Sequence, residues 1–274
     1  MEEGAAEAAG IAGADRMPIR MIASVLWAVG SRTWKKTFRR PVVLVFSLIQ
    51  PLMWMLFFGF LFHRYSLDSE PGSPTYLQFL MPGVCVMTVL FGASQSGSAL
   101  IRDMQSGFLS RMLRTPAPGA AILGGKVLAD ALRLLCQAAV VCLLGLALGA
   151  RIQPQLPSLL LALGYLSLFA MAYSALSNWI ALATRSQETM GVFIQAVNMP
   201  LLFTSTVLVP HRQMPEWLAQ VAAWNPLSSV ANVARGALLR GEDRLGLWPI
   251  LAMGGVAVVL FAGATMALGR NRRG

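Results

Sequence analysis

The sequence predicts an all-α protein that crosses a membrane several times. Its 274 residues are 56% hydrophobic and only 12% charged, and the mean hydropathy is +0.61. A soluble domain carries about 25% charged residues, so these few charges cannot cover a globule of this size. The hydrophobic content also excludes a disordered chain, because such chains combine low hydrophobicity with high net charge.

Six segments are predicted to span the bilayer. A helix needs about 20 apolar residues to cross a hydrocarbon core of about 30 Å. The segments that meet this requirement are 41–62, 78–101, 125–149, 157–183, 191–209 and 248–268. The first is longer than the apolar core of a signal peptide and no cleavage site follows it, so we expect it to stay in the membrane.

The positions of Lys and Arg predict which side of the membrane holds the termini. Of the 22 Lys and Arg, 15 lie before the first span, in 102–126, at Arg185 or after Leu268, and 6 lie in the alternate loops. Because cytoplasmic loops carry the excess of basic residues, both termini are predicted to be cytoplasmic. The net charge of +10 then needs no nucleic-acid partner, which would require a basic face on a soluble domain.

The N-terminal region precedes a single transmembrane domain, expected over 17–274. Residues 1–16 are acidic and rich in Ala and Gly, which predicts a flexible tail. An interfacial helix should follow, anchored by Trp27 and Trp34, because apolar residues recur on one helical face: Ile19, Ile22, Val25, Leu26 and Val29. This helix is either a membrane anchor alone or also a surface for a cytoplasmic partner.

The loop between the second and third spans contains a short predicted helix. Phe108, Leu109, Met112 and Leu113 fall on one face, and prolines after residue 115 end the helix. So short a helix does not fold alone in water. Its apolar face must lie on its own protein, on the membrane or in a partner's groove. Since no predicted span is available to bury it, we expect a groove on a soluble partner.

The segment 210–247 predicts two short helices with a break between them. Helical spacing of apolar residues is interrupted at Asn225-Pro226, and each piece is too short to span. We expect a re-entrant hairpin on the outer side, packed against the other helices. Its marker residues are Trp217, Trp224, Asn225 and Pro226. The alternative is a pair of surface helices over the mouth of the bundle.

No catalytic or metal-binding motif is found in the sequence. The segment Ala120–Val127 resembles a phosphate-binding loop but lacks its first Gly and its final Ser or Thr. The cysteines form no CxxC pair, and His63 and His211 stand alone. We therefore predict that the chain is not an enzyme and binds neither metal nor cofactor.

The predicted spans contain one ion pair and several uncharged polar residues. Asp130 and Arg133 are spaced i, i+3, and we expect them to form a structural pair. Candidates for a substrate path are Gln50, Ser94, Gln95, Asn178, Gln195 and Asn198. Hydrogen bonds between helices are an equally good explanation for each of these six.

Two motifs carry a resemblance to a known family. Asp103–Lys126 contains D-M-Q-S-G-F-L-S-R-M-L-R-T-P followed by I-L-G-G-K, and Met214–Leu227 reads M-P-E-W-L-A-Q-V-A-A-W-N-P-L. With the interfacial helix and the six spans, they resemble the membrane subunit of ABC-2-type exporters over nearly the whole chain after residue 17. The G-F-L-x-R-x-L form is most similar to the daunorubicin-resistance and nodulation-factor exporter branch.

The resemblance implies a permease subunit in a bacterial cytoplasmic membrane, surrounded by lipid. A separate subunit would bind ATP and magnesium, and a second permease, identical or a close paralogue, would complete the path. An amphipathic drug, lipid or glycolipid-like molecule would be exported. The residues that would couple to the ATPase are Asp103, Gly107, Phe108, Leu109, Arg111, Met112 and Leu113.

Two other functions remain compatible with the residues. A secondary transporter driven by an ion gradient would need an ionisable acid within the membrane, and Asp130 is the available one. A membrane scaffold that transports nothing would need no such group. An ATPase encoded beside this chain would favour the ABC exporter over both.

Overall fold

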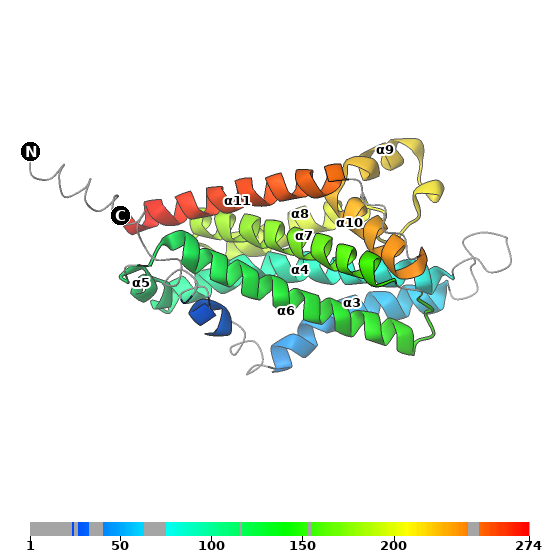
Figure 1. The fold of residues 1–274 in the computed structure, drawn as a ribbon, viewed down its shortest axis with the longest axis horizontal. Helices are drawn as coiled ribbons and strands as arrows, with labels where there is room; N and C mark the ends of the chain where they lie inside the picture. Colours follow the sequence, from blue (N-terminus) through cyan, green and yellow to red (C-terminus); the bar gives the residue numbers. More distant parts are fainter. Residues whose placement is uncertain are drawn as a thin grey trace, which may run out of the picture.

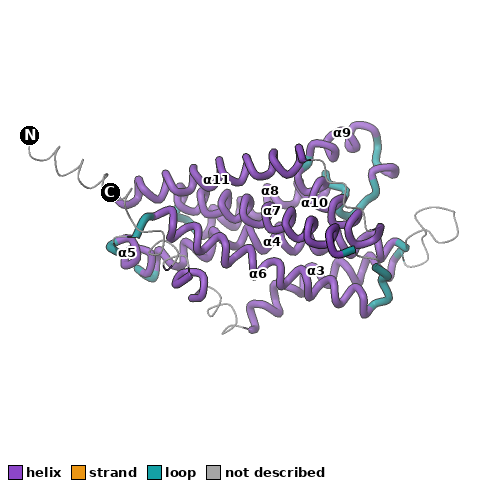
Figure 2. The backbone as a smooth tube through the Cα atoms, viewed as in Figure 1, coloured by secondary structure: helices purple, strands orange, loops and turns teal. Residues whose placement is uncertain are grey.

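The computed structural model describes residues 24, 27–32, 41–62, 75–115, 117–152, 155–240 and 247–273. Helices make up nearly all of this part of the chain, and no strand occurs in it (Figure 2). The predicted all-α class is therefore confirmed for these residues. The predicted tail 1–16, Trp34 and most of the expected interfacial helix lie outside the described residues.

Long helices lie side by side along the long axis of the molecule (Figure 1). They are α3 (Pro41–Leu61), α4 (Tyr76–Gln105), α6 (Gly119–Ala147), α7 (Leu156–Thr184), α8 (Gln187–Phe203) and α11 (Leu247–Arg273). By length and composition, α4, α6, α7 and residues Pro249–Gly269 of α11 can each cross a membrane. The chain is thus a polytopic membrane protein, while six as the number of spans stays a prediction.

Helix α4 forms the centre of the bundle. It contacts α3, α6, α7, α8 and α10, and most of its side chains are buried. Close contact with α7 depends on Gly97, because a Cβ at this position would lie 2.4 Å from the carbonyl oxygen of Ser177. The absence of a side chain lets the two backbones approach, which places the polar residues of α4 against those of α7.

Short helices close the two ends of the bundle. Helix α5 (Phe108–Leu113) joins α4 to α6 at one end, where α11 also finishes (Figure 1). At the opposite end lie α9 (Glu216–Trp224) and α10 (Pro226–Arg235), preceded by a 3-10 turn at His211–Gln213 and followed by a π-helical turn at Gly236–Arg240.

Two helix boundaries differ from the predicted spans in ways that matter for the site. Helix α6 begins at Gly119 rather than near residue 125, so Lys126 lies about two turns inside the helix rather than at its start. Helix α8 ends at Phe203 rather than near residue 209. Residues 119–124 are small or apolar and residues 207–209 are apolar, so hydropathy alone locates neither the start of α6 nor the end of α8.

Candidate functional site

Gly107 reverses the chain between α4 and α5. Its φ of +68° lies in the left-handed region, which glycine adopts at least cost. The N–H groups of Ser106 and Gly107 bond to the carbonyls of Arg102 and Met104 and so close the last turn of α4. A Cβ at Gly107 would have no heavy atom within 4 Å, so the backbone conformation, not lack of space, accounts for this glycine.

The apolar face of α5 is buried on the protein itself. Leu109 is 6% exposed, and Met112 and Leu113 are partly buried against the same cluster. That cluster combines residues of α4, α6, α7, α8 and α11 and includes Leu100, Ile101, Ile122, Leu123 and Leu268. The expectation that this face is left for a partner's groove is therefore wrong. The early start of α6 and the end of α11 supply the surface that the sequence did not reveal.

The described part of the N-terminal helix contacts α5. The guanidinium carbon of Arg32 lies 3.2 Å from the centroid of the Phe108 ring, which is a cation–π arrangement. Val29 is buried, whereas Trp27 is 78% exposed. Arg32, Asp103, Phe108 and Lys126 line one small cavity between the N-terminal helix, α4, α5, α6 and α11. The described part of the N-terminal helix therefore packs against α5 through Arg32 and Phe108.

The outward face of α5 is polar and basic. Ser110, Arg111 and Arg114 are exposed, and Arg111 makes only a long hydrogen bond of 3.5 Å to the carbonyl of Ser106. Asp103, on the last turn of α4, is half-buried. A rigid helix with a buried apolar side and an exposed basic side is suited to receive a second protein.

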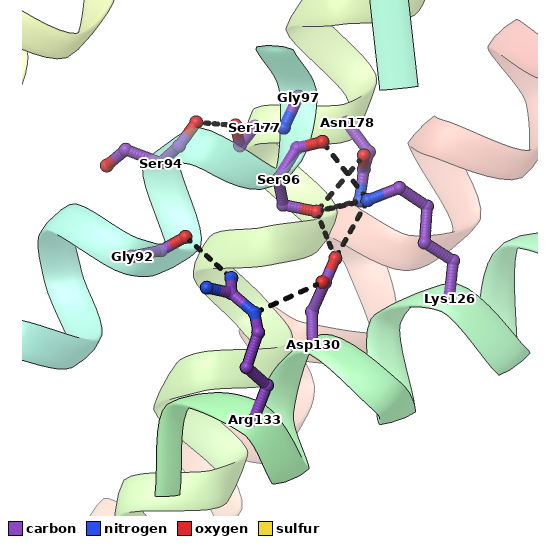
Figure 3. Close-up of polar contacts among 9 residues, drawn as sticks. All are labelled: Gly92, Ser94, Ser96, Gly97, Lys126, Asp130, Arg133, Ser177 and Asn178. Carbon is purple, nitrogen blue, oxygen red and sulfur yellow. Dashed lines mark hydrogen bonds and ion pairs between the residues drawn. The ribbon is translucent and has the colours of Figure 1, made fainter. Parts of the chain in front are cut away.

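A buried network of charged and polar side chains joins α4, α6 and α7 (Figure 3), and its Lys126 lines the same cavity as Phe108 of α5. The Oδ2 atom of Asp130 accepts hydrogen bonds from Lys126 Nζ at 2.8 Å and from Ser96 Oγ at 2.6 Å. Lys126 also donates to the carbonyl of Ser96 at 3.1 Å. Asn178 Nδ2 donates to Ser96 Oγ at 3.0 Å. Three helices are thereby tied together by hydrogen bonds.

The predicted pair of Asp130 and Arg133 is present but secondary. Arg133 Nε lies 3.8 Å from Asp130 Oδ1, and its Nη2 donates to the carbonyl of Gly92 at 3.3 Å. Lys126 is the closer partner, and sequence reasoning missed it by treating it as a loop residue. The i, i+4 spacing of Lys126 and Asp130 was a signal that could have found it.

The six candidate path residues divide into two groups. Ser94, Asn178 and Asn198 are buried in the bundle. Asn198 donates to Ser94 Oγ at 2.7 Å and accepts from the Tyr173 hydroxyl at 2.7 Å. These three therefore connect helices to one another. The other three are exposed on this chain: Gln50 on α3, Gln95 on α4 and Gln195 on α8.

The hairpin at the opposite end contains the two predicted short helices and the break between them. Asn225 caps α10, since its Oδ1 accepts from the Leu227 N–H at 2.9 Å, and Pro226 takes the first helical position, where its missing N–H costs nothing. Trp217 and Trp224 are 66% and 91% exposed. Whether the hairpin re-enters a bilayer stays a prediction.

Comparison with known proteins identifies the family. The sequence model of the ABC-2 type transporter family matches residues 24–239. The chain belongs to this family. The match includes α5, the network around Asp130 and the hairpin. The resemblance noted in the loop and in the Asn-Pro-Leu motif is thus confirmed, and the chain is a transport permease rather than a member of a catalytic family.

Several named ABC-2 relatives are similar over most of their length. The protein named transport permease ycf38 in Cyanophora paradoxa is 32% identical over 204 residues, which cover 74% of this chain and 70% of the relative. The daunorubicin resistance ABC transporter permease protein DrrB1 of Streptomyces coeruleorubidus is 31% identical over 235 residues, 85% of this chain and 81% of the relative. The doxorubicin resistance permease DrrC of Mycobacterium tuberculosis is 24% identical over 240 residues, 85% and 83% of the two chains.

Proposed function

We propose that this permease is the membrane subunit of an ATP-driven exporter whose ATP and magnesium are bound by a separate subunit. The observation that carries the proposal is α5, a short helix with its apolar side buried in the bundle and its basic side exposed. Family membership and relatives named as drug-resistance ABC permeases support it.

Helix α5 is proposed to receive the stroke of the ATPase. Arg111 supplies charge at the contact surface, and Asp103 borders it at the end of α4. Gly107 sets the turn. Because Leu109 is buried among residues of α4, α6 and α11, a displacement of α5 must shift these helices. Met112 and Leu113 pack against the same cluster, and Phe108 packs against Arg32 of the N-terminal helix, so the apolar coupling residues act mainly as anchors.

The path is proposed to form between two permeases, identical or closely related. Exposed polar side chains are costly against lipid tails, and Gln50, Gln95 and Gln195 are exposed on apolar helices of this chain. A second permease facing them would shield the amides and leave a path with polar groups and apolar walls. Such a path suits an amphipathic substrate such as a drug, lipid or glycolipid.

The proposed setting is a bacterial cytoplasmic membrane with α5 and both termini in the cytoplasm. The excess of Lys and Arg in the segments at that end supports this orientation. The hairpin of α9 and α10 would then re-enter the outer leaflet, where exposed Trp217 and Trp224 suit the lipid headgroup region.

An ion-gradient transporter is the alternative function, and Asp130 argues against it. A carboxylate that carries a proton or an ion must exchange it during transport. Here the negative charge of Asp130 is held by two cations, Lys126 at 2.8 Å and Arg133 at 3.8 Å. This arrangement supports a structural role for the acid and leaves ATP as the energy source.

Reversing the charge of the exposed face of α5 tests the proposal. The double variant Arg111→Glu, Arg114→Glu should reduce copurification of the ATP-binding subunit by about tenfold, because loss of complementary charge costs on the order of 1.4 kcal/mol or more. The matched control is Arg151→Glu, which changes an exposed Arg beyond the far end of α6. Undiminished copurification and substrate-stimulated hydrolysis in the double variant would exclude α5 as the coupling element.

A further inference from the structure

The end of α8 is unwound inside a segment whose hydropathy predicted a continuous span. The helical bonding pattern stops at Thr204, whose N–H still bonds to the carbonyl of Pro200 at 2.9 Å. Residues 204–208, here called the unwound segment, continue without regular helix. Backbone groups at membrane depth must find partners within the protein, so the partners of this segment are informative.

One face of α10 supplies those partners. Four polar residues at intervals of three and four lie on one side of this helix, and we call them the polar stripe: Asn225, Ser228, Asn232 and Arg235. Ser228 Oγ accepts from the Thr206 N–H at 3.0 Å, and Asn232 Oδ1 accepts from the Thr206 hydroxyl at 3.1 Å.

Asn225 holds the start of the unwound segment. Its Nδ2 donates to the Leu201 carbonyl at 2.8 Å and to Thr204 Oγ1 at 3.1 Å. The same side chain caps α10 through its Oδ1 atom. Asn225 therefore joins the end of one helix to the beginning of the other.

Arg235 is the last member of the polar stripe and the only charged one. It is 8% exposed, and its Nη2 donates to the carbonyls of Thr206 at 2.7 Å and Val207 at 2.8 Å. Its Nε donates to the Phe79 carbonyl at 3.0 Å and its Nη1 to Asn232 Oδ1 at 3.2 Å. These acceptors are all neutral oxygens. The guanidinium also lies 3.7 Å from the centroid of the Phe79 ring.

Helix α4 is shaped to admit this contact. A Cβ at Gly83 would lie 2.5 Å from the Val207 carbonyl oxygen and 3.1 Å from Arg235 Nη2. The Tyr76 hydroxyl donates to the Leu208 carbonyl at 2.8 Å. Arg235 is thus enclosed between α4, α10 and the unwound segment, with no room for a larger residue on α4.

We propose that Arg235 is a positioning residue that anchors the unwound segment, residues 204–208, to α10 and so joins the end of α8 to α10 as one unit at this end of the bundle. Free carbonyl groups of an interrupted membrane helix can bind a cation. Here the Arg235 guanidinium binds the carbonyls of Thr206 and Val207 instead. In the proposed exporter this unit would close the outer end of the path, and that last statement alone depends on the proposed function.

Hydrogen–deuterium exchange of the full chain with its ATP-binding subunit in lipid nanodiscs tests the proposal. In Arg235→Met, peptides covering residues 204–208 should exchange about tenfold faster or more, because the segment loses an anchor to α10 and opens locally more often, which exposes its N–H groups. Peptides from the contact of α4 with α7 should keep their protection. Arg235→Lys retains the charge and can still reach one or two carbonyls, so it should restore part of the protection. Arg151→Met is the control.

Unchanged exchange at 204–208 in Arg235→Met would overturn the proposal, and so would an equal rise in every helix, which indicates general destabilisation. If Arg235→Met does not insert into the membrane, Arg235→Lys is used instead. A smaller rise in exchange that is confined to residues 204–208 would then support the proposal, and no rise would overturn it. Substrate-stimulated hydrolysis is measured in parallel. Localised exchange with unaffected stimulation would uphold the positioning role and refute the closure of the path, so the two statements fail separately.

Discussion

The buried charges at Asp130 are unbalanced, with one carboxylate facing two cations. Lys126 and Arg133 both lie within 3.8 Å of the Asp130 carboxylate, and Lys126 and Asp130 are buried. Removing one partner of a buried pair costs more than the pair contributes, because the remaining charge is left uncompensated. The three residues should therefore differ in how well the protein tolerates their loss.

Asp130→Asn should be more destabilising than Lys126→Met. The first change leaves two like charges together and should cost about 3–5 kcal/mol of stability. The second leaves Asp130 facing Arg133 and should cost about 1–3 kcal/mol. Thermal unfolding of the purified chain in detergent measures both. The double variant should lie closer to Lys126→Met, and a Lys126→Met protein less stable than Asp130→Asn would refute this charge assignment.

Residue types within the bundle could be predicted from the sequence, but their partners could not. Ser94, Asp130, Arg133, Asn178 and Asn198 were identifiable as inward-facing candidates, whereas Ser96 and Lys126 were not. That Asn198 bonds to Ser94, or Asn178 to Ser96, depends on the rotation of α4, α7 and α8 about their axes. Such rotations are set by close contacts like that at Gly97, which hydropathy does not report.

At the scale of single elements, α5 shows where sequence reasoning succeeds and where it stops. The helix and its apolar face were predicted, because the spacing of apolar residues and the prolines that follow are local properties. What covers that face was predicted wrongly. The answer depends on Leu268 of α11, more than 150 positions away, and on the early start of α6.

Leu109→Ala should loosen α5 without preventing insertion. Truncating a buried Leu costs about 2–5 kcal/mol, and the loss falls on the contact of α5 with the bundle. We expect substrate-stimulated hydrolysis by the copurified complex to fall by about tenfold, while basal hydrolysis by the ATP-binding subunit is retained. Ser110→Ala, on the exposed side of the same helix, should have no effect. Equal effects of the two changes would show that anchoring of α5 is unimportant.

The end of α8 is the second feature that the local sequence could not predict. Residues 191–209 read as one apolar segment, yet the helix stops at Phe203. The groups that stabilise the break come from α10, beginning at Asn225. An isolated segment contains no information about such distant partners. The sequence showed the hairpin and its break clearly, because Asn-Pro is a local signal.

At the scale of the whole molecule, the two ends of the bundle are closed by different short helices. One end holds α5, its exposed arginines and the described part of the N-terminal helix. The other holds α9 and α10 (Figure 1). Helical class and the order of the apolar segments were predictable from composition and periodicity. The central claim is that the ATP-binding subunit contacts the end that holds α5. It depends both on the orientation of the chain in the membrane and on the identity of the partner.

Site-specific cross-linking tests this claim most directly. In a chain whose native cysteines Cys85, Cys136 and Cys142 are replaced, a single cysteine at Ser110 or at Gln220 carries a photo-activated cross-linker. Both positions are exposed, on α5 and α9 respectively. With the ATP-binding subunit co-expressed, Ser110→Cys should give a cross-linked product with that subunit and Gln220→Cys should give none. A product at Gln220, or its absence at Ser110 in a complex that copurifies, would contradict the account.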